Sequence, residues 1–310
     1  MAGLDLPGVH VLHTMDDSFL VHDRVVSGKL RDVAIVGSGY IGLEIADALT
    51  HRGLRVTLFG RAETVLPIVD RPLGLAIADE PRRNGVEVHA GVAVQGIDRG
   101  GHRRPTARGA GVRTTADLVV VAAGVQPNTT LAAAAGVETG IKGAIRVDRR
   151  MATNVPDVYA PATASKPGIG CGSPRRTCHS GPPATNRGGW PARTPLAVNT
   201  SSKAASAPRS SRSSIWRSHE PGLREQEARQ AGFDPLTAET QAWDHKAYYP
   251  GAHQLCLRLT GDRQTGRLLG GQILGPWQAE VAKRIDGEPT GDAEASPVRR
   301  NEAAARPANP

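Results

Sequence analysis

The residues with the clearest chemical potential lie between positions 37 and 42, where the chain reads Gly37, Ser38, Gly39, Tyr40, Ile41 and Gly42. The spacing G-x-G-x-x-G is typical of a turn that binds the pyrophosphate of a dinucleotide. The first glycine permits a tight turn, the second lets the backbone approach the phosphates, and the third allows a helix to pack closely on a strand. A helix N-terminus with unpaired N–H groups would then hold the negative charge.

Such a turn requires a strand before it and a helix after it, and the flanking sequence predicts both. Residues 33–36 (VAIV) form a short apolar run that is typical of a parallel strand buried on both faces. Apolar residues then recur with helical spacing up to Gly53, a residue type typical of helix C-termini. Residues 55–59 (RVTLF) predict a second strand. We expect a dinucleotide-binding α/β unit; the alternative is a structural glycine turn in another α/β protein.

The end of the second predicted strand bears on which nucleotide binds. A site for NAD usually places Asp or Glu there, where the carboxylate holds the ribose 2′-hydroxyl. This chain has Gly60 followed by Arg61, and a guanidinium pairs with a phosphate through two parallel hydrogen bonds. The pattern favours NADPH over NADH, while Glu63 is the residue that would reach the ribose of NADH instead.

Charge and composition limit the other functions. The net charge of +8 would suit a nucleic-acid partner, but nine Lys and Arg residues lie between Asp157 and Glu220, where no acidic residue occurs, and the remaining charges nearly cancel. This segment, residues 161–219, is rich in Ser, Pro and Gly and has no apolar periodicity, so it predicts a disordered insert. A nucleic-acid-binding arm is the alternative, for which only Trp190 and Trp216 offer stacking faces.

Membrane and metal functions find no support in the sequence. No apolar run approaches the roughly 18 to 20 residues of a membrane span, and the N-terminus lacks the layout of a signal peptide. We therefore expect a cytoplasmic protein without a membrane partner. The three cysteines lack paired spacing, which argues against a disulfide framework and a zinc site.

Beyond the glycine turn, several segments resemble the pyridine nucleotide-disulfide oxidoreductases, in their NADH oxidase and coenzyme A disulfide reductase branch. Residues 33–44 (VAIVGSGYIGLE) are similar to the family's NAD motif, and residues 119–128 (VVVAAGVQPN) to its strand followed by GVxPN. Residues 146–160 are similar to the lead-in to its second flavin contact. Residues 222–286, with WDHK and LLGGQI, resemble the start of its C-terminal dimerisation domain.

The resemblance implies an FAD- and NAD(P)H-dependent oxidoreductase that passes hydride from the nicotinamide to a flavin and on to a disulfide or oxygen. It places Glu44 and Tyr40 at the nicotinamide end, with Tyr40 gating the flavin face, and brings the backbone of Gly124 close to the cofactor. It also implies a homodimer. The alternative is that both are ordinary residues in the first turn of a helix, where the helix dipole stabilises a Glu.

The chain also departs from the family pattern. It begins after the family's own flavin-binding glycine motif and redox-active cysteine, and Tyr159-Ala160 is followed by Pro161-Ala162-Thr163 instead of Ala-Gly-Asp. The family's C-terminal His and Glu have no counterpart beyond Asp286. We therefore expect an N-terminally truncated chain with impaired FAD binding and activity. The alternative is a non-catalytic dinucleotide-binding fragment, and reading-frame shifts would explain the breaks in the resemblance.

These observations together predict an α/β fold with a Rossmann-like NAD(P)-binding domain, a disordered insert and a partial α+β dimerisation-type domain. Within the C-terminal part, the pattern predicts a short helix, an antiparallel hairpin that turns at residues 261–266, and a helix from Gln278. The expected organisation is a linker (1–30), the NAD(P)-binding domain (31–124), a remnant of the FAD domain's return segment (125–160), the insert (161–219), the dimerisation-type domain (220–286) and a disordered tail (287–310).

Overall fold

The computed structural model describes most of the chain. The described residues are 1–101, 104–140, 143–148, 151–160, 165–167, 209–212, 216–220, 222–276 and 278–279, with the backbone alone described at 165–167, 209–212 and 216–220. Most of the segment predicted to be disordered (161–219), the tail (287–310) and most of the helix predicted from Gln278 lie outside these residues.

A five-stranded parallel sheet forms the centre of the N-terminal domain. Its strand order is β1-β8-β2-β3-β4, and every neighbouring pair is parallel. The strands are β1 (Val9–Val11), β2 (Asp32–Val36), β3 (Arg55–Gly60), β4 (Glu87–Ala90) and β8 (Leu118–Val121). The side chains of β8 are buried on both faces of the sheet, as are nearly all those of β2, which explains why these strands read as unbroken apolar runs. The predicted α/β fold with a parallel sheet is confirmed.

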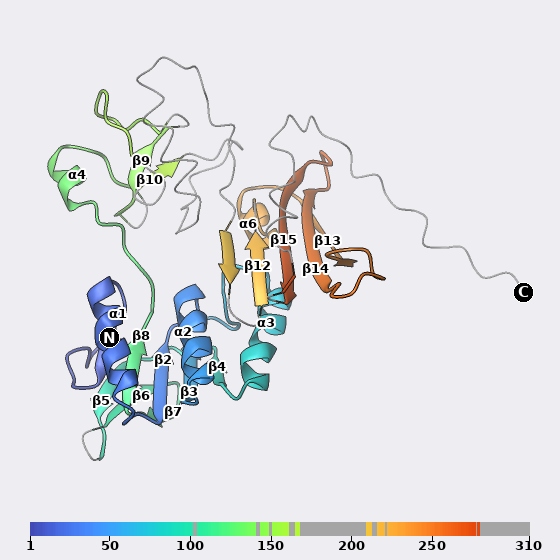
Figure 1. Cartoon of the computed structure of the whole chain (residues 1–310). Helices are drawn as coiled ribbons and strands as arrows, with labels where there is room; N and C mark the ends of the chain where they lie inside the picture. The colour runs from blue at the N-terminus through green and yellow to red at the C-terminus, as the bar shows by residue number, and fades with distance from the viewer. Residues whose placement is uncertain are drawn as a thin grey trace, which may run out of the picture.

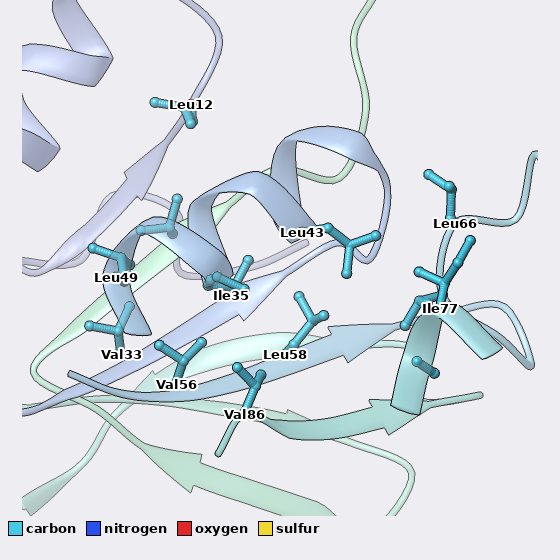
Figure 2. Close-up of a cluster of buried hydrophobic side chains, with 14 of the residues drawn as sticks. Leu12, Val33, Ile35, Leu43, Leu49, Val56, Leu58, Leu66, Ile77 and Val86 are labelled. Carbon is cyan, nitrogen blue, oxygen red and sulfur yellow. The ribbon is translucent and has the colours of Figure 1, made fainter. Parts of the chain in front are cut away.

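Helices cover one face of this sheet and an antiparallel meander covers the other. Figure 2 shows Leu43 and Leu49 of α2 lying over Ile35 of β2 and Leu58 of β3, with Ile77 of α3 in the same cluster. On the opposite face, Phe59 and the other strand side chains that point away from the helices pack against the meander. The covering elements are α1 (Met15–Val26), α2 (Tyr40–His51) and α3 (Arg71–Arg83) on one side, and β5 (Gly96–Arg99), β6 (Pro105–Gly109) and β7 (Val112–Thr115) on the other.

Residues 1–30, expected from the sequence to be a linker, contribute to the domain itself. Strand β1 pairs in parallel with β8 and forms the edge of the sheet. Helix α1 follows it and begins with a capping box, in which Thr14 and Asp17 each accept a hydrogen bond from the other's backbone N–H. Leu12 and Val21 enter the main apolar cluster. The N-terminal segment therefore extends the sheet and helps to cover it.

The C-terminal part is an antiparallel sheet that lies beside α3 (Figure 1). Its strand order is β11-β12-β15-β14-β13. Its elements are β11 (Arg209–Arg212), β12 (Trp216–Glu220), α6 (Glu225–Gln230), β13 (Pro235–Trp243), β14 (Gln254–Asp262) and β15 (Leu268–Pro276). The predicted short helix and the hairpin turning near residues 261–266 are confirmed. Cys256 and Leu274 from this sheet pack against the main apolar cluster of the N-terminal domain.

A small third unit separates the two sheets along the chain. It contains α4 (Thr130–Ala134) and β9 (Ile145–Val147), which pairs in parallel with β10 (Ser165–Pro167). Val137, Ile145 and Ala160 form its buried cluster. None of the helices among the residues described is long and apolar enough to cross a membrane.

Candidate dinucleotide-binding site

The carboxyl ends of three neighbouring parallel strands bring the motif residues together. Strand β2 leads into the glycine turn at Gly37, β3 ends at Gly60 before Arg61, and β8 leads to Gly124. Because β8, β2 and β3 are adjacent in the sheet, these three ends lie at one edge. Ligands of open α/β sheets bind outside the carboxyl ends of the strands. The topology therefore brings the predicted site residues together at this end of the sheet.

The three glycines of the motif have different surroundings. Gly37 has φ +124°, and a Cβ there would overlap the carbonyl of Ala122 at the end of β8. A Cβ at Gly42 would overlap the carbonyl oxygen of Gly37, so this glycine lets α2 start directly against the turn. A Cβ at Gly39, in contrast, would meet no atom of the described residues within 4 Å. Gly37 and Gly42 therefore close the turn, and Gly39 presents its open side.

Helix α2 begins immediately after this open glycine. Gly39 is its N-cap residue, with no side chain to bond the free N–H groups of the first turn, and the helix starts at Tyr40. A helix start without a side-chain cap leaves its backbone donors for another partner. An anion above Gly39 would receive those hydrogen bonds and the positive end of the helix dipole.

The end of β3 is shaped by a contact that the sequence pattern did not reveal. Ser38 is buried, and a Cβ at Gly60 would overlap its side-chain oxygen. The carboxylate that an NAD site usually carries at this place could not be added unless Ser38 moved. The packing of Ser38 over the strand end therefore leaves no room for a side chain at position 60.

Two charged residues after β3 differ in their pairing. Arg61 is exposed, and within the described part of the chain its guanidinium has no ion-pair partner. Glu63 is also exposed, but its carboxylate lies 3.4 Å from the guanidinium of Arg71. The cation is thus available to a phosphate at this edge, while the carboxylate that would hold a free ribose hydroxyl has a competing partner.

Tyr40 and Glu44 lie one turn apart on α2, so they share one side of the helix beside the glycine turn. Tyr40 is half-buried and packs against the main apolar cluster. The Glu44 side chain is exposed overall, yet desolvation of its carboxyl, and then the charge of Asp47, raise its pKa above the usual value. Ile41, between them, is also exposed. Their roles at a nicotinamide remain predictions.

Gly124 is held by a residue that the sequence pattern did not single out. It has φ +130°, and its carbonyl oxygen lies 2.9 Å from Nε2 of His13, the residue that links β1 to α1. The backbone N–H of His13 donates to the carboxylate of Asp17, which fixes the start of the helix and lowers the pKa of Asp17. The Thr14-x-x-Asp17 capping pattern was the local signal that could have revealed this helix start.

Comparisons with known proteins agree with this geometry. Residues 2–166 match the family model for pyridine nucleotide-disulphide oxidoreductase. The chain is 34% identical over 291 residues to the NAD(P)H sulfur oxidoreductase (CoA-dependent) of Pyrococcus furiosus, an alignment that covers 92% of this chain and 63% of the relative. It is 30% identical over 290 residues to the NAD(P)H coenzyme A polysulfide/persulfide reductase of Pyrococcus horikoshii, with the same shares covered.

Among solved structures, the NAD-dependent persulfide reductase from A. fulgidus superposes with a TM-score of 0.83 at 28% sequence identity. This superposition covers 92% of the present chain and 53% of the reductase. The chain therefore spans less than two thirds of the length of these relatives.

Proposed function

Because the chain belongs to the pyridine nucleotide-disulphide oxidoreductase family, we propose that it binds NAD(P)H at the carboxyl edge of its parallel sheet as part of an oxidoreductase. The observation that carries the proposal is the open side of Gly39, next to an uncapped helix N-terminus and between two glycines that admit no side chain. The described residues fit the pyrophosphate of such a nucleotide. Residues 31–124 are the nucleotide-binding domain of this proposal.

We propose an acceptor of the disulfide or persulfide class for the electrons of the nicotinamide, with oxygen as the second candidate. The relatives named for sulfur, polysulfide and persulfide reduction support the first class. In the family, bound FAD takes up the hydride. The family's flavin contact has Ala-Gly-Asp after the Tyr-Ala pair. In this chain Tyr159-Ala160 is followed by Pro161-Ala162-Thr163, which does not fit that contact. We therefore assign no flavin step to residues of this chain, and a non-catalytic nucleotide-binding role is the alternative.

We further propose that residues 220–286 belong to a homodimer interface, as the resemblance to a dimerisation domain implies. Leu236 on β13 and Leu259 on β14 support this proposal, because both are at least 44% exposed and lie on the same face of the C-terminal sheet. Exposed apolar side chains that lie together on one face are typical of interaction surfaces.

Replacing Arg61 by glutamine tests the proposed choice of nucleotide. We expect the dissociation constant of NADPH to rise roughly 10- to 100-fold, because charge-assisted hydrogen bonds contribute about 1.5–3 kcal/mol. That of NADH should barely change, because NADH has no 2′-phosphate. Both constants can be measured by calorimetric titration of the full chain.

Arg52→Gln is the matched control, because Arg52 is an exposed arginine at the opposite end of α2. It should leave both constants unchanged. Equal weakening of NADPH and NADH in the Arg61 variant would contradict a role for Arg61 in reading the 2′-phosphate. Wild-type protein that binds neither nucleotide would contradict the proposed function itself.

Replacing His13 by alanine tests the role of Gly124. The loss of one hydrogen bond of roughly 0.5–1.5 kcal/mol should free the carbonyl of Gly124 and weaken nucleotide binding about three- to tenfold. His22→Ala is the control, since His22 is an exposed histidine of α1 whose ring has a hydrogen bond only to Asp23 among the described residues. Equal affinities of the two variants would show that Gly124 does not need this contact to bind the cofactor.

A further inference from the structure

The segment that carries Arg61 is residues 61–70, here called the selector loop, which connects β3 to α3. Under the proposed function, this loop determines which nucleotide binds. An arginine discriminates a 2′-phosphate only when the backbone that carries it is held in place, because a bidentate pair has strict geometry. The contacts that hold the loop are therefore part of the specificity of the site.

The middle of the selector loop is attached to the glycine turn. The backbone N–H of Leu66 donates to the carbonyl of Ser38 at 2.7 Å. Leu66 is fully buried and has φ +48°, a left-handed conformation that is unusual for a residue with a large side chain. Such a conformation persists only where the surrounding structure fixes it. The loop therefore needs firm support from its neighbours.

The far end of the selector loop is attached to the C-terminal sheet. The backbone N–H of Asp70 donates to Oε1 of Gln272 at 2.7 Å, and Nε2 of Gln272 donates to Oδ2 of Asp70 at 2.8 Å. Both residues are buried, with 9% and 3% of their surfaces exposed. One side chain thus satisfies a buried backbone donor and a buried carboxylate 202 positions away, an arrangement that is costly to break.

Two arginines of the C-terminal part reinforce this attachment. The guanidinium of Arg224, at the start of α6, donates to the carbonyl of Pro67 at 2.6 Å. Arg258 on β14 lies opposite Gln272 in the sheet, and its Nε is 3.4 Å from Oδ2 of Asp70. The selector loop is therefore held between the glycine turn on one side and the C-terminal sheet on the other.

We infer that the C-terminal sheet sets nucleotide specificity from a distance, with Gln272 and Arg224 as positioning residues that act through Asp70 and Pro67 on Arg61. The inference rests on the proposed function, because it assumes that Arg61 contacts the nucleotide. Loosening the attachment enlarges the range of positions that Arg61 samples. The contact with a 2′-phosphate then weakens, while the contacts of the glycine turn with the pyrophosphate remain.

Gln272→Leu tests the inference, because leucine has a similar volume and neither donates nor accepts. We expect NADPH affinity to fall about five- to tenfold, within the range found for mutations that alter coupling between sites. NADH affinity should stay within about twofold, so the ratio of the two affinities falls, which a general loss of structure would not cause. Thr260→Val is the control: it removes a partly buried hydrogen bond to Thr237 in the same sheet, and among the described residues the Thr260 hydroxyl does not bond to the selector loop.

A second readout works without nucleotide. Amide hydrogen exchange at Leu66 and Val69 should accelerate in Gln272→Leu and not in Thr260→Val. The N–H of Leu66 donates to the carbonyl of Ser38 and the N–H of Val69 to that of Leu66, so both hydrogen bonds depend on how firmly the selector loop is held. Unchanged exchange, or an unchanged affinity ratio in protein that binds nucleotide, would overturn the inference. If Gln272→Leu fails to fold, Arg224→Met takes its place under the same criteria. Failure of the wild type to bind either nucleotide would instead count against the proposed function, and loop exchange would still decide whether the attachment holds.

Discussion

Replacing Gly39 by valine is expected to abolish nucleotide binding while leaving the thermal unfolding of the protein close to that of the wild type. A Cβ at position 39 meets no atom of the described residues within 4 Å, and the backbone angles there (φ −82°, ψ −168°) suit any L-residue. The valine side chain would fill the space through which the pyrophosphate must approach. Losing two charge-assisted hydrogen bonds, each of about 1.5–3 kcal/mol, makes binding weaker by roughly a hundredfold or more.

The measurement pairs a nucleotide titration with thermal unfolding followed by circular dichroism. The exchange of an N-cap glycine for valine should cost no more than about 1 kcal/mol of stability. Ala48→Val is a suitable control, because it introduces the same side chain at an exposed position of α2 away from the turn. A Gly39 variant that binds NADPH as tightly as the wild type would show that the pyrophosphate does not lie over this turn.

Local sequence signals were sufficient to predict the part of the fold that carries the motif. An apolar strand, a glycine turn and a helix of periodic apolar residues are specified by neighbours within a few positions, and β2, α2 and β3 form where these signals place them. Gly53 ends the helix with φ +79°, as its residue type predicts. The glycine turn from Gly37 to Gly42 likewise lies between this strand and this helix, within the same short stretch of sequence.

Contacts between distant positions could not be read from the sequence. The strand β1 has three residues, too few for a periodic signal, and its place in the sheet depends on β8, more than a hundred positions away. Gln272 is the only polar side chain of β15, and no local signal indicates that it is buried against Asp70. From the sequence, Gly60 was notable because it stands where an NAD site usually has a carboxylate. The structure adds that the side chain of Ser38 occupies the space that a side chain at position 60 would need.

Gly42→Ala is the second large effect that we expect, and it acts on stability. A Cβ at position 42 would overlap the carbonyl oxygen of Gly37 and lie 3.6 Å from Cγ2 of Ile35 in the core. Neither neighbour can yield easily, because Gly37 is itself confined by the carbonyl of Ala122. Helix α2 must therefore move away from β2, which we expect to cost roughly 3 kcal/mol, the upper end of the usual range for overpacking. The midpoint of thermal unfolding should fall by about 6–12 °C.

Gly39→Ala gives a matched comparison, because it adds the same methyl group three residues earlier in the same motif, where there is open space. Gly42→Ala should be the less stable variant even without nucleotide, whereas Gly39→Ala should unfold near the wild-type temperature and lose affinity instead. Equal stability of the two variants would mean that α2 does not pack as closely on the turn as the structure shows. The pair thus separates the glycine that closes the turn from the glycine that faces the ligand, since only the first is required by the protein's own packing.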